Sequence, residues 1–106
     1  MSQKITVVRT YLLEGKDDLE EVLRILHDQE KVSGVTVIRA IEGYGESGRG
    51  KMHTSSLLAL SLELPLIVEF FDEPERVEHV IHTLEEQLGL KHIISWSAFS
   101  HLPDQR

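Results

Sequence analysis

The sequence predicts an α+β fold in which two helices cover one face of a four-stranded antiparallel sheet. Two segments carry apolar residues at helical spacing, and each lies between segments rich in β-branched and aromatic residues. The resulting order is strand, helix, strand, strand, helix, strand, which is the split arrangement of a ferredoxin-like sandwich. Right-handed connections then place both helices on the same face and order the strands last, first, third, second across the sheet.

The first strand is expected over residues 3–12, with apolar side chains on both faces. Asp17 or Asp18 is expected to cap the first helix, because a carboxylate accepts hydrogen bonds from the free N–H groups of a first turn. Lys31 is expected in the last turn of this helix, and Gly34 is the stop signal just past it. The buried stripe of the helix consists of Leu19, Val22, Leu23 and Leu26.

The centre of the chain, residues 34–72, is expected to contain a strand, a long glycine-rich loop and a returning strand. The β-branched run after Gly34 is typical of a strand. Pro65 fits near the start of the returning strand, where its missing N–H interrupts no ladder. The loop at about residues 43–63 is far longer than a hairpin needs, and such connections are usually functional or disordered. We expect this loop to be the working part of the protein.

The second helix is expected to begin around Asp72. Asp72 and Glu75 form a D-x-x-E capping pattern, and Pro74 suits a first turn. Gly89 is a typical C-terminal stop. Between them, the buried stripe consists of Val77, Val80, Ile81, Leu84 and Leu88. The last strand is expected over residues 93–100.

The predicted strands are apolar on both faces, although the helices cover only one. One face is expected to carry Ile5, Val7, Tyr11, Val37, Ile41, Ile67 and Phe71, and the other Val8, Ile38, Leu66, Val68 and Phe70. An exposed apolar face of that size is rare in a monomer, so we expect oligomerisation through the sheet. The alternative is a bulge that shifts this assignment by one residue. Arg9, Arg39 and Glu69 share the first face and are expected to form one ion network there.

The composition indicates a single domain, residues 1–106, of a cytoplasmic protein. The net charge of −7 argues against binding to nucleic acid, because affinity for phosphates depends on an excess of Lys and Arg. The lack of cysteine excludes a disulfide framework and a thiolate metal site. No apolar run approaches a membrane span, and the N-terminus lacks the apolar core of a signal peptide. No catalytic triad or carboxylate pair is visible, so we expect a protein that is not an enzyme.

The run Thr-Val-Ile-Arg-Ala-Ile-Glu-Gly-Tyr-Gly at residues 36–45 is a family motif, together with the short sequences at residues 53–55, 60–61 and 64–65. These motifs resemble the PII signalling proteins, and more closely a sister group of small bacterial PII-like proteins of no settled function. The resemblance covers nearly the whole chain. It implies a ferredoxin-like subunit, a homotrimer packed through the sheets, and a mobile loop that signals to a partner such as a membrane transporter or an enzyme.

The chain departs from the PII pattern at three places. Residues 54–62 contain no tyrosine for covalent modification, and Gly89-Leu90-Lys91 only partly matches the phosphate-gripping turn before the last strand. The paired C-terminal arginines of the PII proteins are absent, since Arg106 stands alone. The resemblance therefore implies the fold more strongly than it implies nucleotide binding.

The resemblance also implies an adenine nucleotide as the ligand, held between subunits. The candidate binding residues are Gly43, Gly45, Arg49, Lys51 and Lys91. Glycines let backbone N–H groups converge on phosphate oxygens, and an arginine supplies two parallel donors. The alternative interpretation is a solvated loop whose charges are incidental.

The alternative function is that of a CutA-type trimeric protein of divalent-metal tolerance, which has the same architecture and would use the histidines. His79 and His82 stand three residues apart on the second helix and could share one ion, with His53 or His92 approaching from elsewhere. Exposed histidines at this spacing usually form only a polar face, so we assign no metal ligand.

Overall fold

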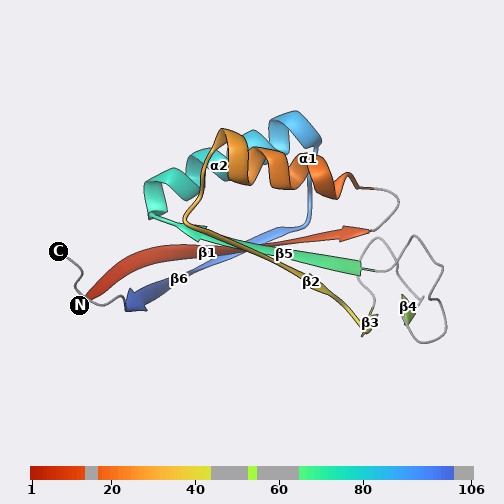
Figure 1. The fold of residues 1–106 in the computed structure, drawn as a ribbon, viewed down its shortest axis with the longest axis horizontal. Coiled ribbons are helices and arrows are strands. Elements are labelled where there is room, and N and C mark those ends of the chain that lie inside the picture. The colour runs from red at the N-terminus through yellow and green to blue at the C-terminus, as the bar shows by residue number, and fades with distance from the viewer. Residues whose placement is uncertain (14–16, 44–52, 55–64, 102–106) are drawn as a thin grey trace.

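The computed structural model describes residues 1–13, 17–43, 53–54 and 65–101. Four strands form one antiparallel sheet in the order β2-β5-β1-β6. The strands are β1 (Ser2–Leu13), β2 (Gly34–Arg39), β5 (Pro65–Asp72) and β6 (Ile93–His101). The helical segments lie together on one side of this sheet (Figure 1). The predicted α+β class, strand order and helix placement are confirmed.

The first helical segment begins as α1 (Leu19–Leu23) and continues as a π-helical stretch, η1 (Arg24–Gln29). Asp18 is its N-cap, and its side chain accepts a hydrogen bond from the backbone N–H of Glu21 at 3.1 Å. The wider π turn is visible where the N–H of Glu30 donates to the carbonyl of Ile25, at 2.8 Å. This turn buries Ile25 together with the predicted Val22 and Leu26.

The end of this segment differs from the prediction. Lys31 lies past η1 and takes the left-handed conformation with φ 53°, while the N–H of Val32 donates to the carbonyl of Leu26 at 3.0 Å. Gly34 is instead the first residue of β2. Closing the helix therefore depends on a lysine in a conformation that glycine adopts more easily.

The second helix, α2 (Pro74–Leu88), has the predicted bounds. Gly89 ends it in the left-handed conformation, with φ 66°. The predicted cap is wrong in detail, because Glu73 is the N-cap and caps with no side-chain hydrogen bond. Pro74 occupies the first turn, where its missing N–H would have had no partner within the helix.

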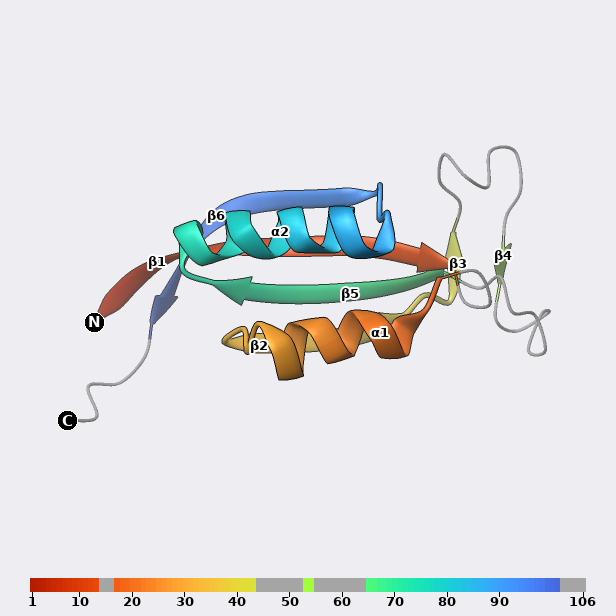
Figure 2. The same ribbon diagram turned by 90° about the horizontal axis from the view of Figure 1, so that it is seen from above.

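The hydrophobic core fills the space between the sheet and the helical layer, and α2 packs against β1 and β5 (Figure 2). Leu90, in the turn after α2, closes one end of this core. The other buried members come from the sheet and from the inner stripes of the helices: Val8, Leu12, Val22, Ile25, Leu26, Leu66, Val68, Phe70, Val77, Val80 and Leu84. The helical spacing of apolar residues in the sequence therefore predicted which side of each helix packs against the sheet.

The predicted face assignment was off by one residue in β2. Ile38 stands opposite Ile67, and Val37 stands opposite Val68. Directly opposite residues share a face, so Ile38 lies on the side away from the helices and Val37 on the core side. The run in β2 is apolar at both alternations, so its pattern could not set the register.

A close contact at the start of β2 is consistent with the observed register. Gly34 stands opposite Phe71, and a Cβ added at Gly34 would lie 2.4 Å from Cε2 of that ring. The Phe71 ring therefore covers the glycine, and a side chain at this position would have to displace the ring.

The Gly34→Ala variant is expected to lose about 1–3 kcal/mol of unfolding free energy, because the new methyl group must displace the Phe71 ring. Urea denaturation at fixed protein concentration measures the loss. The same substitution in a Phe71→Leu background is the control, since the smaller side chain leaves room for the methyl group. An equal loss in both backgrounds would show that ring contact is not the cause.

Candidate functional site

The long central connection leaves the sheet through a short two-stranded ladder. β3 (Glu42–Gly43) pairs antiparallel with β4 (His53–Thr54), and Gly43 stands opposite His53. Figure 2 shows this ladder beyond the end of the sheet where β1 stops and β5 begins. Gly43, the first of the predicted binding residues, therefore lies at the base of the connection.

Lys91 lies at the same end of the sheet, exposed in the turn between α2 and β6. The carbonyl of the next residue, His92, accepts a hydrogen bond of 3.1 Å from the N–H of Tyr11, which ties this turn to the end of β1. However, β6 and β2 are the two edge strands of the sheet. Lys91 and Gly43 thus share one end of the fold, where Lys91 precedes the edge strand β6 and Gly43 lies in the β3–β4 ladder, which is separate from the four-stranded sheet.

The other three predicted binding residues, Gly45, Arg49 and Lys51, lie outside the described residues. The same holds for most of the 43–63 loop, of which the structure describes residues 43 and 53–54. Their part in a site stays a prediction.

The side of the sheet away from the helices is largely apolar, and we call it the uncovered face. It is lined by Ile5, Val7, Tyr11, Ile38, Ile67, Phe71, Ile94, Trp96 and Ala98, with Thr36 and one ion pair among them and the polar pair Gln3 and Ser100 at one end. Trp96 is 41% exposed and Ile94 49% exposed. A continuous apolar surface of this kind usually marks an interface.

The ion pair of the uncovered face joins neighbouring strands. Nε of Arg9 donates to Oε1 of Glu69 at 2.8 Å, and the Arg9 guanidinium carbon lies 5.8 Å from the centre of the Trp96 ring. The hydrogen bond to Glu69, followed by one to Tyr11, raises the pKa of Arg9 above its usual value. The Arg9–Glu69 part of the predicted network is confirmed.

The prediction that Arg39 is the third member of that network was wrong. Thr36 stands opposite Glu69, whereas Arg39 stands opposite Leu66 and so shares the core side of the sheet. The cause is the same one-residue shift that exchanged the sides of Val37 and Ile38.

The histidines of α2 each approach a different carboxylate. Nε2 of His79 lies 3.5 Å from Oε1 of Glu30, and Nε2 of His82 lies 3.3 Å from Oε2 of Glu86. Within the part of the chain that the structure describes, no three His, Cys, Asp or Glu side chains are grouped so that they could hold a metal ion.

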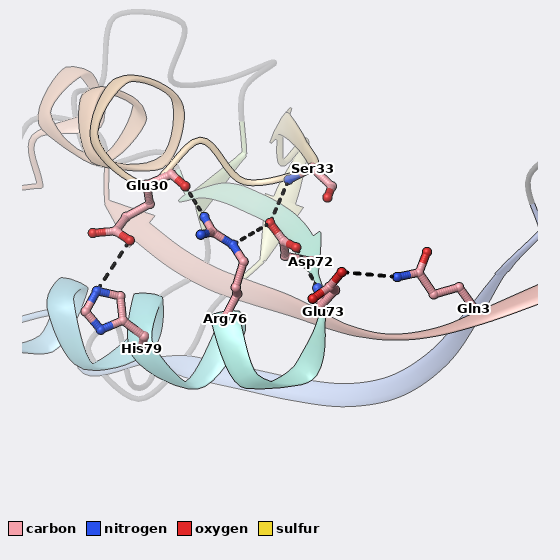
Figure 3. Close-up of polar contacts among 7 residues, drawn as sticks. All are labelled: Gln3, Glu30, Ser33, Asp72, Glu73, Arg76 and His79. Atoms are coloured by element: carbon pink, nitrogen blue, oxygen red, sulfur yellow. Dashed lines mark hydrogen bonds and ion pairs between the residues drawn. The ribbon is translucent and has the colours of Figure 1, made fainter. Parts of the chain in front are cut away.

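A polar cluster that the sequence reasoning missed joins the first helical segment to α2 (Figure 3). The Asp72 carboxylate accepts hydrogen bonds from the N–H of Ser33 at 3.1 Å, from the N–H of Glu73 at 2.6 Å, and from Nε of Arg76 at 3.3 Å. Arg76 also donates to the carbonyl of Glu30. Asp72 ends β5 at the end opposite the loop, so this cluster is architectural and is not part of the candidate site.

A hollow of 420 Å³ lies at the end of η1, lined by His27, Asp28, Lys31 and Val32. Nδ1 of His27 lies 2.7 Å from Oδ1 of Asp28, and both side chains are largely exposed. No pattern of residues in the sequence predicted this hollow, because it forms where the π-helical turn of η1 meets Lys31 in its left-handed conformation.

The Lys31→Gly variant is expected to gain about 0.5–1 kcal/mol of unfolding free energy, because glycine takes a left-handed conformation without the Cβ clash. The Lys31→Ala variant removes the same charge but keeps the Cβ, so it should show no such gain. Thermal and urea denaturation of both variants measure the difference. A glycine variant no more stable than the alanine variant would contradict this account of the turn.

Among the described residues, no helix is long and apolar enough to cross a membrane. The described ion pairs and hydrogen bonds contain no nucleophile positioned beside a general base. The arrangement offers instead a loop base at one end of a sheet and a broad apolar face.

Comparison with known proteins shows a family profile and related sequences that match this sequence, and solved structures that share its fold. The profile of the family described as "DUF190: Uncharacterized ACR" matches residues 4–98. A UPF0166 protein of Methanocaldococcus jannaschii is 34% identical over 88 residues, 78% of each chain. A UPF0166 protein of Aquifex aeolicus is 35% identical over 54 residues, 51% of this chain and 50% of that protein.

Two kinds of solved structure share the architecture. CPII from Thiomonas intermedia K12, a nitrogen regulatory PII-like protein bound to ADP, AMP and bicarbonate, matches with a TM-score of 0.66 and 14% identity, covering 98% of this chain and 100% of that one. CutA1 from Oryza sativa matches with a TM-score of 0.62 and 9% identity, covering 97% and 85%. At these identities the likeness shows the fold, which is PII-like.

Proposed function

The chain belongs to the DUF190 family, and we propose that it is a homotrimeric PII-like regulatory protein that binds an adenine nucleotide between subunits. It would act in the cytoplasm without catalysing a reaction or binding nucleic acid. The observation that carries the proposal is the uncovered face, which is apolar, broad and left open by both helices. Three copies that pack these faces together would remove them from water.

The position of the candidate binding residues favours a site shared by two subunits. Gly43 and Lys91 lie at the same end of the sheet, with Gly43 in the ladder that follows the edge strand β2 and Lys91 just before the other edge strand, β6. In a ring of three copies, the β2 edge of one subunit faces the β6 edge of the next. Such a ring would bring Lys91 of one copy toward Gly43 of its neighbour, with the phosphates between them.

In this proposal the backbone of Gly43 and Gly45 forms the floor of the phosphate site, and Arg49 and Lys51 fold over the phosphate oxygens. The likeness to CPII, whose solved form holds ADP and AMP, supports an adenine nucleotide as the ligand. The ligand changes the order of the 43–63 loop, which then engages or releases a membrane transporter or an enzyme. Such a switch requires only that the ligand contact the two loop states differently.

Calorimetry with AMP, ADP, ATP and cyclic AMP tests the nucleotide site. We expect at least one of them to bind the wild type more tightly than about 1 mM, the weak limit of measurable affinity. The Arg49→Ala/Lys51→Ala variant should bind it at least tenfold more weakly, because two cations near the phosphates are removed. The Lys4→Ala/Arg24→Ala variant loses the same charges elsewhere and should bind normally. If no nucleotide binds, or if the Arg49→Ala/Lys51→Ala variant binds as tightly as the wild type, the proposed nucleotide site is wrong. The loop would then act only in docking to a protein partner.

The CutA1 likeness keeps divalent-metal binding as a second candidate, with a comparable TM-score of 0.62. A thermal-shift screen separates the two, since a ligand that binds only the folded state raises its melting temperature by mass action. Nucleotides should raise the melting temperature if the regulatory proposal is right. A response confined to divalent cations would favour the CutA-type function.

A further inference from the structure

The Arg9–Glu69 ion pair lies in the middle of the uncovered face. The row of residues across the sheet at this level is Ile94, Arg9, Glu69 and Thr36. The row on one side holds Trp96, Val7, Phe71 and Gly34, and the row on the other holds Tyr11, Ile67 and Ile38. The two charges are thus enclosed by apolar rows.

In a single chain both charges still reach water, since the Arg9 and Glu69 side chains are 36% and 30% exposed. They are also held firmly. Arg9 donates to Glu69 at 2.8 Å and lies over the Trp96 ring, 5.8 Å from its centre. Any molecule that covers the face removes the water that still contacts this ion pair. The donors and acceptors of Arg9 and Glu69 that are not used in the pair then need partners on that molecule.

The distribution of charge indicates that the covering molecule is a second copy of this chain. The whole protein carries a net charge of −7, and the helical side exposes many carboxylates, among them Glu20, Asp28, Glu75, Glu78, Glu85 and Glu86. On the uncovered face, by contrast, the described residues carry one positive and one negative charge, which neutralise each other. Two strongly acidic molecules therefore approach most easily through this face.

We infer that the Arg9–Glu69 pair selects one arrangement of the copies in the assembly, rather than supplying its affinity. This rests on the proposed self-association of the uncovered face. Apolar surfaces can slide over one another with little change in energy, whereas a covered ion pair tolerates only the arrangement in which its remaining donors and acceptors are satisfied. A buried polar residue fixes register and oligomeric state in coiled coils by the same physics.

Native mass spectrometry of the Arg9→Met/Glu69→Met variant tests this inference. Methionine replaces both charged side chains with apolar ones of similar length, so the variant should still associate at least as tightly as the wild type. Its copies should populate several stoichiometries, while the wild type shows one. The Glu21→Met/Arg24→Met variant is the matched control, because it removes another Arg–Glu pair, with a 3.0 Å contact, from the helical side. The control should keep the wild-type stoichiometry.

A single substitution tests what an unpaired charge on the uncovered face does to the strength of self-association. Glu69→Gln leaves the Arg9 charge without its counter-charge in the covered face, and association should weaken by a factor of about 100 or more. Circular dichroism of each variant establishes that it is folded.

The outcomes are distinct. A double-methionine variant that forms the wild-type assembly alone would overturn the inference and leave the proposed trimer intact. A double-methionine variant that is folded but monomeric would also overturn it, by showing that the pair supplies the affinity. A wild-type protein that is itself monomeric would refute the proposed trimer.

Discussion

Replacing Asp72 with alanine is expected to lower the free energy of unfolding by about 3 kcal/mol. The Asp72 side chain is only 7% exposed, and its carboxylate accepts hydrogen bonds from the backbone N–H groups of Ser33 and Glu73 and from Arg76. Alanine leaves these donors without their acceptor and separates the start of β2 from the start of α2. Urea denaturation at fixed protein concentration, followed by circular dichroism, measures the loss.

Two control variants make the Asp72 result specific. Asp72→Asn keeps the volume and one acceptor oxygen, so it should lose less, about 1–2 kcal/mol. Asp28→Ala removes an exposed carboxylate of the helical layer, and its effect should stay within about 0.5 kcal/mol. If Asp72→Ala also stayed within that range, the polar cluster would not be holding the two elements together.

The Ile67→Lys variant is expected to be monomeric where the wild type is trimeric. Ile67 lies between Tyr11 and Ile38 on the uncovered face. Packing three copies would bury three ammonium groups without partners, and each such burial costs far more than an isoleucine contact supplies. Light scattering at micromolar concentration gives the mass of the assembly.

The Gln87→Lys variant adds the same charge to the exposed side of α2 and should remain trimeric. A trimeric Ile67→Lys variant would place the interface elsewhere on the molecule. A monomeric wild type at this concentration would remove the need for an interface on the uncovered face.

The elements and their order could be predicted because each is specified locally. The apolar stripe of α2 repeats at helical spacing over several turns, and Pro74 and Gly89 mark its ends by chemistry that depends on neighbouring residues alone. Asp18 likewise caps α1 through a contact three residues away. Once the order of elements was known, the handedness of the connections determined the order of the strands.

The register of β2 could not be predicted, because it depends on a residue far away in the sequence. Its apolar run fits either alternation, and in the observed register Gly34 lies under the ring of Phe71, a residue that comes much later in the chain. Asp72 is a similar case. Its nearest sequence pattern was a capping box, but its partner Ser33 belongs to a segment 39 residues earlier.

The candidate site was predictable only in outline. Lys91 is placed at one end of the sheet by α2 and β6, whose bounds the sequence did specify, whereas Gly43 lies in the β3–β4 ladder, which falls within the predicted 43–63 loop and was not predicted. The strands nearest to them in the chain, β2 and β6, are the two edges of the four-stranded sheet, as the predicted strand order requires. Gly45, Arg49 and Lys51 lie outside the described residues, so their role remains a prediction.

The strand order also has a consequence for how the chain folds during synthesis. β5 lies between β1 and β2, and β6 pairs with β1 so that Ser2 stands opposite His101. A nascent chain that has not yet reached residue 65 therefore holds β1 and β2 before any of the strands that pair with them in the final sheet has been made. Pairings between such distant residues form slowly, and unpaired edges are prone to aggregate in the meantime. The first helical segment, which forms from local contacts, is already complete at that stage, whereas α2, which packs against β1 and β5, is made only after β5.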